Sequence, residues 1–267
     1  MRNPRIVVVL PAYNAARTLE RTYADIPKDK VHRIILVDDV SRDQTVEIAR
    51  SLGLSVVIHV QNRGYGGNQK TCYLEALKEE ADVVVMLHPD HQYDSRLVPE
   101  LVAPILEGRA DMVMGSRILN GKALEGGMPI WKFFANRALT ILENLVFRTR
   151  LTDCHSGFRA YSRRLLTTVP FLLNADDFVF DSQMIAQAAI KGFCVSEVPV
   201  QARYFPEASS VNFRVSTIYG LKTLGVAARF ALQRIGFAHF SVFERTLPEV
   251  ISRHYHEAIF RPSGSEM

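Results

Sequence analysis

Short runs of β-branched residues alternate with longer segments of helical spacing through the first half of the chain. Five runs have the composition of buried strands: residues 6–10, 34–37, 56–60, 83–87 and 112–114. The segments between them carry apolar residues at helical spacing: residues 16–26, 43–52, 68–80 and 95–106. Because strands that alternate with helices form parallel sheets covered by helices, the pattern predicts an α/β fold with a mostly parallel central sheet flanked by helices.

The composition is that of an ordinary globular domain. The 267 residues suffice for one sizeable core, and 48% apolar with 22% charged residues argue against disordered and fibrous classes. The most apolar late stretch, 215–243, contains Lys222, Arg229 and Arg234, whereas a membrane span needs about 20 apolar residues. Only residues 6–10 are apolar before Pro11, too few for a signal peptide. We therefore expect a cytoplasmic protein whose membrane contact, if any, is peripheral and at the inner face of the cell membrane.

Cysteine and charge patterns exclude two further classes. Cys72, Cys154 and Cys194 lie far apart without a C-x-x-C pair, so neither a disulfide framework nor a zinc knuckle is predicted. The net charge of +4 suits an anionic ligand or an anionic membrane surface. It does not by itself indicate nucleic acid, and we predict no nucleic-acid partner.

The second half of the chain predicts amphipathic helices. Residues 129–147 place an apolar stripe on one helical face: Ile130, Phe134, Ala138, Ile141 and Leu145. Basic residues are interleaved with it, which is typical of a helix that lies on a membrane surface; a helix packed on the core explains the stripe equally well. These basic residues are Lys132, Arg137 and Arg148. Further helices are predicted over 181–191 and 215–236, a strand over 195–200, and a loose tail from His254 to Met267.

Short motifs rich in polar residues follow the first three predicted strands. Ligands of parallel sheets bind at the carboxyl ends of the strands, so these residues should lie along one rim. They are Pro11, Tyr13 and Asn14 after the first strand, Asp38 and Asp39 after the second, and Asn62 and Gly64 after the third. A buried carboxylate there can hold a base or ribose. Alternatively, the Asp pair only closes a turn in which Ser41 or Asp43 caps the next helix.

The fourth strand ends in a dense group of oxygen and imidazole ligands, His88-Pro89-Asp90-His91-Gln92. Mg²⁺ or Mn²⁺ prefers oxygen ligands and would bridge a diphosphate, neutralising the charge of a leaving group. A polar turn that closes a strand is the alternative. The two histidines alone are weak evidence for zinc.

Taken together, these motifs resemble those of the family 2 inverting glycosyltransferases of GT-A fold. Within them, the chain is similar to the branch of dolichyl-phosphate mannose synthase and bacterial polyprenyl-phosphate glycosyltransferases. The motifs, in chain order, are Pro11-Ala12-Tyr13-Asn14, Val37-Asp38-Asp39-x-Ser41-x-Asp43, Asn62-Arg63-Gly64, Gly115-Ser116-Arg117 and Asp153-x-x-Ser156-Gly157-Phe158-Arg159. The resemblance covers roughly residues 5 to 215 and implies a GT-A domain over 1–215, with a nucleotide-binding half over about 1–118 and an acceptor half over about 119–215. Residues 216–267 then form C-terminal amphipathic helix and tail.

The resemblance also implies roles for individual residues. The donor, a nucleotide diphosphate sugar, would contact Pro11, Tyr13, Asn14, Asp38, Asp39, Asn62, Gly64, Asp90, Arg117 and Arg203. The metal, Mg²⁺ or Mn²⁺, would be held by Asp90 and Gln92, and His88 stands where the family has its first metal-binding Asp. A second departure is Ala15 and Ala16, where acidic residues usually follow the opening motif. The resemblance further implies a mobile loop near Arg203 and Arg214 that clamps donor or acceptor.

Three residues are candidates for the chemical step: Arg117 at the phosphates, Asp153 at the sugar and acceptor, and Asp181 as a second acidic residue. A hydroxyl acceptor would need a base to remove its proton, whereas a lipid phosphate would not. A favourable carboxylate at a helix N-terminus is the alternative for Asp181.

The sequence thus predicts a metal-assisted, inverting transfer of a sugar to an acceptor, a polyprenyl phosphate or a glycan. Two alternatives remain: a nucleotidyltransferase, which should show a Gly-rich loop that residues 11–14 lack, and a catalytically silent protein that binds a sugar nucleotide or a lipid. The donor sugar, its base and the oligomeric state are left open.

Overall fold

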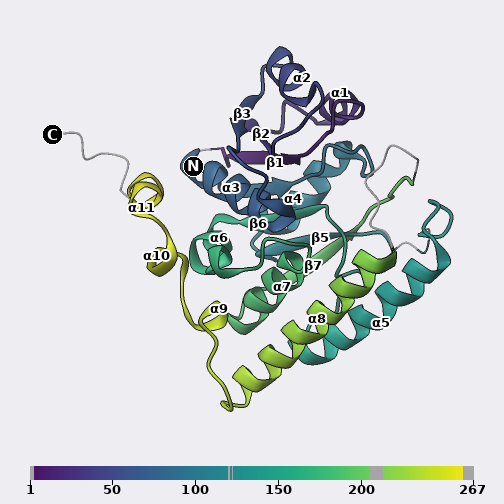
Figure 1. Ribbon diagram of the computed structural model, residues 1–267, viewed down its shortest axis with the longest axis vertical. Helices are drawn as coiled ribbons and strands as arrows, with labels where there is room; N and C mark the ends of the chain where they lie inside the picture. The colour runs from purple at the N-terminus through teal and green to yellow at the C-terminus, as the bar shows by residue number, and fades with distance from the viewer. Residues whose placement is uncertain (1–2, 120, 122, 205–212, 261–267) are drawn as a thin grey trace.

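A twisted sheet of seven strands runs through the centre of the computed structural model, which describes residues 3–119, 121, 123–204 and 213–260 (Figure 1). The strand order is β3-β2-β1-β4-β6-β5-β7. The strands are β1 (Ile6–Ala12), β2 (Arg33–Asp38), β3 (Ser55–Ile58), β4 (Val83–Met86), β5 (Met112–Ser116), β6 (Arg159–Ser162) and β7 (Val195–Pro199). The main helices are α1 (Leu19–Asp25), α2 (Thr45–Ser51), α3 (Gly64–Lys78), α4 (Val98–Leu106), α5 (Ile130–Phe147), α6 (Arg163–Thr168), α7 (Phe180–Ile190) and α8 (Phe213–Arg234). Short helices α9 (Ser241–Glu244), α10 (Leu247–Val250) and α11 (Arg253–Phe260) follow.

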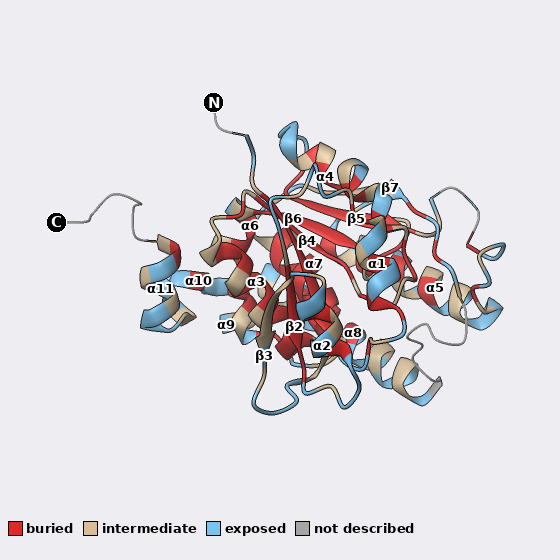
Figure 2. Cartoon of the chain, turned by 90° about the horizontal axis from the view of Figure 1, so that it is seen from above, coloured by how far each residue is buried: buried red, intermediate tan, exposed pale blue. Residues whose placement is uncertain are grey.

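The predicted parallel core is confirmed. Strand β1 pairs in parallel with β2 and β4, and all seven of its residues are buried. Val7 and Val9 belong to the core on one face of the sheet, whereas Val8 and Leu10 belong to the core on the other, as the alternation of side chains along a strand requires. Both faces are covered by helices (Figure 2), so the strands read as continuous apolar runs.

Strand β6 makes the sheet mixed, and the sequence did not predict it. It pairs antiparallel with β4 on one side and with β5 on the other. Its four residues, Arg-Ala-Tyr-Ser, contain no β-branched residue, which is why composition gave no signal. Arg159 within it is fully buried because it forms an ion pair with Asp181.

Helix α3 begins four residues earlier than predicted, at Gly64. The glycines of its first turn resemble a loop in sequence, but they allow the helix to pack closely on the segment before α7. A Cβ atom at Gly66 would lie 2.3 Å from the carbonyl oxygen of Ala175, so only glycine fits there.

The predicted tail is helical where the structure describes it. Tyr255 of α11 donates a hydrogen bond to Glu75 of α3, and Arg163 of α6 donates to the carbonyl of Ile259. The expectation of a loose tail from His254 is therefore wrong up to Phe260, because side-chain contacts anchor this segment; residues 261–267 lie outside the described residues.

Helices α5 and α8 pack side by side beyond the β5–β7 edge of the sheet (Figure 1). Within the described residues, none of the helices is both long and apolar enough to cross a bilayer.

Candidate functional site

One cavity of about 690 Å³ opens at the carboxyl ends of β1, β2, β4 and β5. Its far wall comes from α5 and α8. Most of the predicted site residues line it together: Pro11, Tyr13, Asn14, Asp39, Asn62, Gly64, His88, Asp90, Gln92, Arg117 and Asp181. Asp38, Asp153 and Arg203 are not part of its lining. The strand-end rim inferred from sequence is thus a real concave surface.

Asp39 is a buried carboxylate that organises the deep end of this rim. It accepts hydrogen bonds from the backbone N–H groups of Arg63 and Gly64, at 2.7 and 2.9 Å, and so satisfies the amino end of α3. The Nδ1 atom of His59 lies 2.8 Å from the same carboxylate, and its Nε2 atom lies 2.9 Å from the Thr71 hydroxyl. Sequence analysis did not single out His59, because an isolated histidine after a strand carries no motif.

Hydrogen bonds connect the turn after β1 to the turn after β2. The Asn14 carboxamide oxygen accepts from the backbone N–H of Arg42, and the Ser41 hydroxyl accepts from that of Asn14. Asp38 accepts from the backbone N–H of Ser41 at 2.9 Å, so one of its oxygens closes the turn. Helix α2 begins at Thr45, whose N–H donates to Asp43. The turn-closing alternative therefore describes Asp38 well, while Asp39 faces the cavity.

His88 is packed into the wall of the cavity. Its ring stacks on Tyr65 with 5.3 Å between centroids, and its Nε2 atom lies 3.3 Å from the Tyr65 hydroxyl. A Cβ atom at Gly157 would come within 2.9 Å of the ring, so glycine makes room for it. Burial lowers the pKa of His88, which keeps the imidazole neutral.

The side chains around Asp90 could hold a cation only together with oxygen atoms of a bound substrate. In the part of the chain that the structure describes, no group of three or more His, Cys, Asp or Glu side chains could hold a metal ion. The Asp90 carboxylate nevertheless lines the cavity, and it accepts from the backbone N–H of Gln92. Mg²⁺ is commonly held by one or two carboxylates together with substrate phosphates and water. The residues present therefore suit a metal shared with a diphosphate, not a cage of protein ligands alone.

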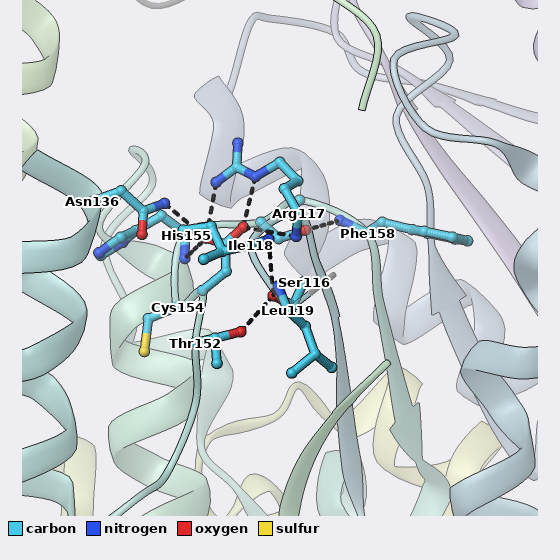
Figure 3. Close-up of polar contacts among 12 residues, drawn as sticks. Ser116, Arg117, Ile118, Leu119, Asn136, Thr152, Cys154, His155 and Phe158 are labelled. Atoms are coloured by element: carbon cyan, nitrogen blue, oxygen red, sulfur yellow. Dashed lines mark hydrogen bonds and ion pairs between the residues drawn. The ribbon is translucent and has the colours of Figure 1, made fainter. Parts of the chain in front are cut away.

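Arg117 and Asp153 form a bidentate ion pair at the centre of the site (Figure 3). Nε and Nη2 of Arg117 lie 2.7 and 2.9 Å from the two carboxylate oxygens, and Asn136 of α5 donates to Asp153 at 2.8 Å. Burial alone would raise the pKa of Asp153, but the guanidinium holds that pKa well below its usual range. Arg117 lines the cavity, whereas the oxygens of the fully buried Asp153 face Arg117 and Asn136.

Asp181 lies in the first turn of α7 and joins three partners. It accepts from the Tyr65 hydroxyl at 2.7 Å and from Gln69 at 3.2 Å, and it pairs with Arg159 at 3.1 Å. The carboxylate therefore neutralises the buried guanidinium of Arg159. It also interacts favourably with the N-terminus of α7. Arg203 lies at the rim, where its Nη1 atom is 3.2 Å from His91. The predicted mobile loop falls largely on residues 205–212, outside the described residues.

The wall formed by α5 and α8 presents both polar and apolar side chains to the cavity and exposes apolar side chains on its outer side. Inside, the cavity is lined by Trp131, Lys132, Ala135, Asn136, Leu139, Ser216 and Tyr219, with His155 beside them. The apolar stripe predicted on α5 points outward: Ile130 is 67%, Phe134 66% and Leu145 73% exposed. Leu221 of α8, at 64%, extends this outer face. The stripe is thus not used for packing on the core.

His155 and Tyr219 were not among the predicted site residues. Nδ1 of His155 lies 2.6 Å from the Tyr219 hydroxyl, across 64 positions of sequence. Tyr219 lies in a predicted helix with no local motif, so only the packing of α8 onto the site reveals it.

Comparison with known proteins shows which family the chain resembles over most of its length. Residues 7–169 match the family model for glycosyl transferase family 2. An uncharacterised protein of Methanocaldococcus jannaschii is 32% identical over 219 residues, which cover 82% of this chain and 89% of that protein. The UDP-N-acetylglucosamine–dolichyl-phosphate N-acetylglucosaminyltransferase of Methanococcus voltae is 27% identical over 221 residues, covering 76% and 88%.

Among solved structures, glucosyl-3-phosphoglycerate synthase of Mycobacterium tuberculosis has the same fold. In complex with Mn²⁺, UDP-glucose and phosphoglyceric acid, it superimposes with a TM-score of 0.64 at 22% identity, covering 89% of this chain and 82% of that one. The likeness confirms the predicted GT-A arrangement of a mostly parallel sheet flanked by helices.

Proposed function

This chain belongs to glycosyl transferase family 2, and on that basis we propose that it transfers a sugar from a nucleotide diphosphate sugar to a polyprenyl phosphate at a membrane surface. One observation carries the proposal. A single cavity joins the strand-end rim, with Asp39 and Asp90, to a wall of two helices whose outer face is apolar and exposed. A water-soluble donor and a lipid acceptor could therefore meet in it.

The donor is assigned to the rim of β1, β2 and α3. Asp39 offers a carboxylate fixed by His59 and by the amino end of α3, and Tyr13 lies half-exposed above it. Such a fixed acceptor suits the N–H or O–H groups of a nucleoside. The diphosphate would then reach Asp90 and Arg117, the next polar groups along the cavity.

A divalent cation would be held by Asp90 together with the diphosphate oxygens. When bound, Mg²⁺ or Mn²⁺ supplies positive charge to the diphosphate as it leaves. The M. tuberculosis enzyme, which binds Mn²⁺ with UDP-glucose, supports this assignment. Gln92 would orient Asp90 through the hydrogen bond from its backbone N–H, while His88 would shape the wall and not bind the metal.

The acceptor is assigned to the wall of α5 and α8. Lys132 and Arg117 line the cavity there and suit a phosphate. In the transfer, a phosphate oxygen attacks the anomeric carbon from the face opposite the nucleotide; the bond to the leaving diphosphate breaks, its electron pair stays on the diphosphate, and the configuration inverts. A phosphate dianion carries no proton on the attacking oxygen, so no base is required. Asp153 acts by holding Arg117 in place.

The outer face of α5 and α8 is assigned to the membrane interface. Its apolar residues, defined here as the outer apolar face, are Ile130, Phe134, Ile141, Leu145, Ile218, Leu221 and Leu224. Arg148, at the end of α5, would favour an anionic leaflet. The acceptor in the M. voltae relative is dolichyl phosphate, which supports a peripheral position at the inner face of the cell membrane.

A thermal-shift panel of nucleotide sugars, with and without Mn²⁺, followed by a transfer assay with a polyprenyl phosphate, tests the proposal. A donor should raise the melting temperature more with Mn²⁺ than without it, and Asp90→Ala should abolish both this increment and the transfer. Full transfer by Asp90→Ala, at unchanged folding, would refute the metal assignment. Transfer to a glycan in place of the lipid phosphate would refute the acceptor.

A catalytically silent binder is the second candidate, because His88 occupies the wall where the family has a metal-binding carboxylate. Calorimetry separates the two. Nucleotide binding that Mg²⁺ or Mn²⁺ leaves unchanged, with neither transfer nor donor hydrolysis, would favour the silent protein.

A further inference from the structure

A fully buried carboxyl group, that of Glu143, lies on the inner face of α5. Among the described residues neither of its oxygens meets the geometry of a hydrogen bond, although the side chains of Ser182 and Cys154 lie close enough to act on it. The Nε2 atom of His155 lies 3.2 Å from one of these oxygens and likewise meets no hydrogen-bond geometry. Buried polar groups are rarely left unsatisfied, so a carboxyl in this position calls for a functional explanation.

His155 links Glu143 to the cavity. The imidazole lines the cavity, and its other nitrogen, Nδ1, contacts the cavity-lining Tyr219 hydroxyl at 2.6 Å. Its backbone N–H donates to Asp153, the partner of Arg117. Only the imidazole of His155 therefore separates the charge of Glu143 from this part of the cavity. The surroundings have a low dielectric constant, in which charges interact strongly.

The other groups around this pair are already balanced. Those that act on Glu143 or His155 from the neighbouring elements are Arg159 on β6, Asp153 and Cys154 in the loop before β6, Ser182 on α7, Tyr219 on α8 and Arg117 after β5. Arg117 pairs with Asp153, and Arg159 pairs with Asp181. Among the described residues, ionisation of Glu143 therefore adds a negative charge beside ion pairs that are already formed.

Burial also sets where the carboxyl titrates. It raises the pKa of Glu143 to about 7 and lowers the pKa of His155 to about 4. The imidazole is therefore neutral near pH 7, and Glu143 is the group that changes charge there.

We propose that Glu143 is a positioning residue for the acceptor: it takes up a proton when a phosphate monoester occupies the wall of α5 and α8, so that acceptor binding weakens as the pH rises above neutrality. The inference rests on the proposed acceptor. The protonated carboxyl donates to Nε2 of His155, whose Nδ1–H then donates to the Tyr219 oxygen, so every member of the chain is satisfied. Ionised Glu143 would leave a negative charge next to His155, whose imidazole lines the cavity that receives the phosphate.

The pH dependence has a distinctive sign. A phosphate monoester loses its second proton near pH 6, and the resulting dianion should bind Lys132 and Arg117 more tightly. Ionisation of Glu143 acts in the opposite direction. The KM for acceptor should therefore rise by roughly two- to threefold between pH 7 and 8.5, because a total coupling of about fivefold is only partly expressed between these pH values, while the KM for donor stays constant.

The experiment uses farnesyl phosphate as the acceptor probe with the full chain. Calorimetry at pH 7.5 in two buffers of different ionisation enthalpy should show proton uptake on binding, and Glu143→Gln should abolish both the uptake and the rise of KM. Glu75→Gln is the matched control, since Glu75 of α3 contacts Tyr255 and Lys78 away from the cavity, and it should behave as the wild type.

The outcomes separate this inference from the proposed function. Transfer to a polyprenyl phosphate with equal proton uptake in wild type and Glu143→Gln would overturn the inference and leave the acceptor intact. Absence of both binding and transfer would overturn both. Because glutamine is isosteric with glutamate and removes a buried charge, the variant should fold, which circular dichroism checks.

Discussion

At the scale of single residues, the site depends on buried carboxylates that differ in how they are paired. Asp39 accepts three hydrogen bonds or ionic contacts, Asp153 is held by a guanidinium and an amide, and Glu143 lies against the neutral imidazole of His155. Motif spacing predicted Asp39, Asp90 and Arg117 at one rim, because strand ends meet in space. It could not predict His59, Glu143 or Tyr219, whose importance arises from contacts between segments that are distant in sequence.

Glu143 should make the stability of the protein depend on pH. Its folded-state pKa of about 7 lies above the ordinary value of 4.5, so the folded chain binds more protons than the unfolded chain between these values, and stability falls as the pH rises through them. The cost, absent below pH 4.5, reaches about 3 kcal/mol above pH 7. Urea unfolding should therefore show that Glu143→Gln gains stability over the wild type at pH 8 but not at pH 4. An equal gain at both values would mean that the carboxyl does not titrate in this range.

Replacement of Arg117 by lysine should be costly despite the retained charge. Lysine cannot form the bidentate contact with Asp153, and loss of one charged hydrogen bond is worth about 1.5–3 kcal/mol. We expect Arg117→Lys to lower kcat/KM by roughly 10- to 100-fold, measured in the transfer assay. Arg109→Lys is the control, because Arg109 pairs only with Glu107 on the surface. Equal activity of both variants would contradict the role given to Arg117.

At the scale of elements, the helices α5 and α8 line the cavity on one side and expose the outer apolar face on the other. Asn136, Thr140 and Glu143 face inward on α5, while the outer apolar face is exposed. Helical spacing predicted the stripe on α5, but it left open which side of the helix would be buried. Asn136, Thr140 and Glu143 face inward because this side of α5 lies against the polar groups of the site. Strand β6 escaped prediction because it has four residues and none of them is β-branched, and helix α11 because its amphipathic pattern spans only eight residues.

Charged residues on the outer apolar face should prevent membrane binding. Phe134→Glu combined with Leu221→Glu places two carboxylates where bare apolar groups now stand, at 66% and 64% exposure. In liposome flotation with anionic vesicles, the wild type should float and the double variant should stay in the dense fraction, with an unchanged circular dichroism spectrum. Leu106→Glu, on α4, is the control and should float. Flotation of the double variant would exclude this face as the membrane contact.

At the scale of the whole molecule, the C-terminal segment packs on the same face of the sheet as α3, α5 and α8, but away from the cavity. The short helices α9–α11 return past α7 and α6 to α3, away from α5 (Figure 1). This segment buries Leu247 completely, yet contributes nothing to the lining of the cavity. It therefore stabilises the fold without shaping the site.

Leu247→Ala should separate stability from function. Truncation of a fully buried leucine costs roughly 2–5 kcal/mol, so the melting temperature should fall by several degrees. The KM for donor and that for acceptor should not change, since no residue of α10 lines the cavity. A change in either KM at a temperature where the variant is folded would show that the segment communicates with the site.

The position of β6 has a consequence for how the chain acquires its structure during synthesis. Strands β1 to β4 pair with one another, so residues 6–86 contain a complete four-stranded sheet that can form before the later strands are synthesised. Strand β5, made next, has no partner in that sheet until β6 emerges more than 40 residues later and bridges it to β4. The part of the sheet made of β1 to β4 can therefore form early and act as a template, whereas β5 must wait for β6, and this late long-range pairing is where we expect folding to be slowest.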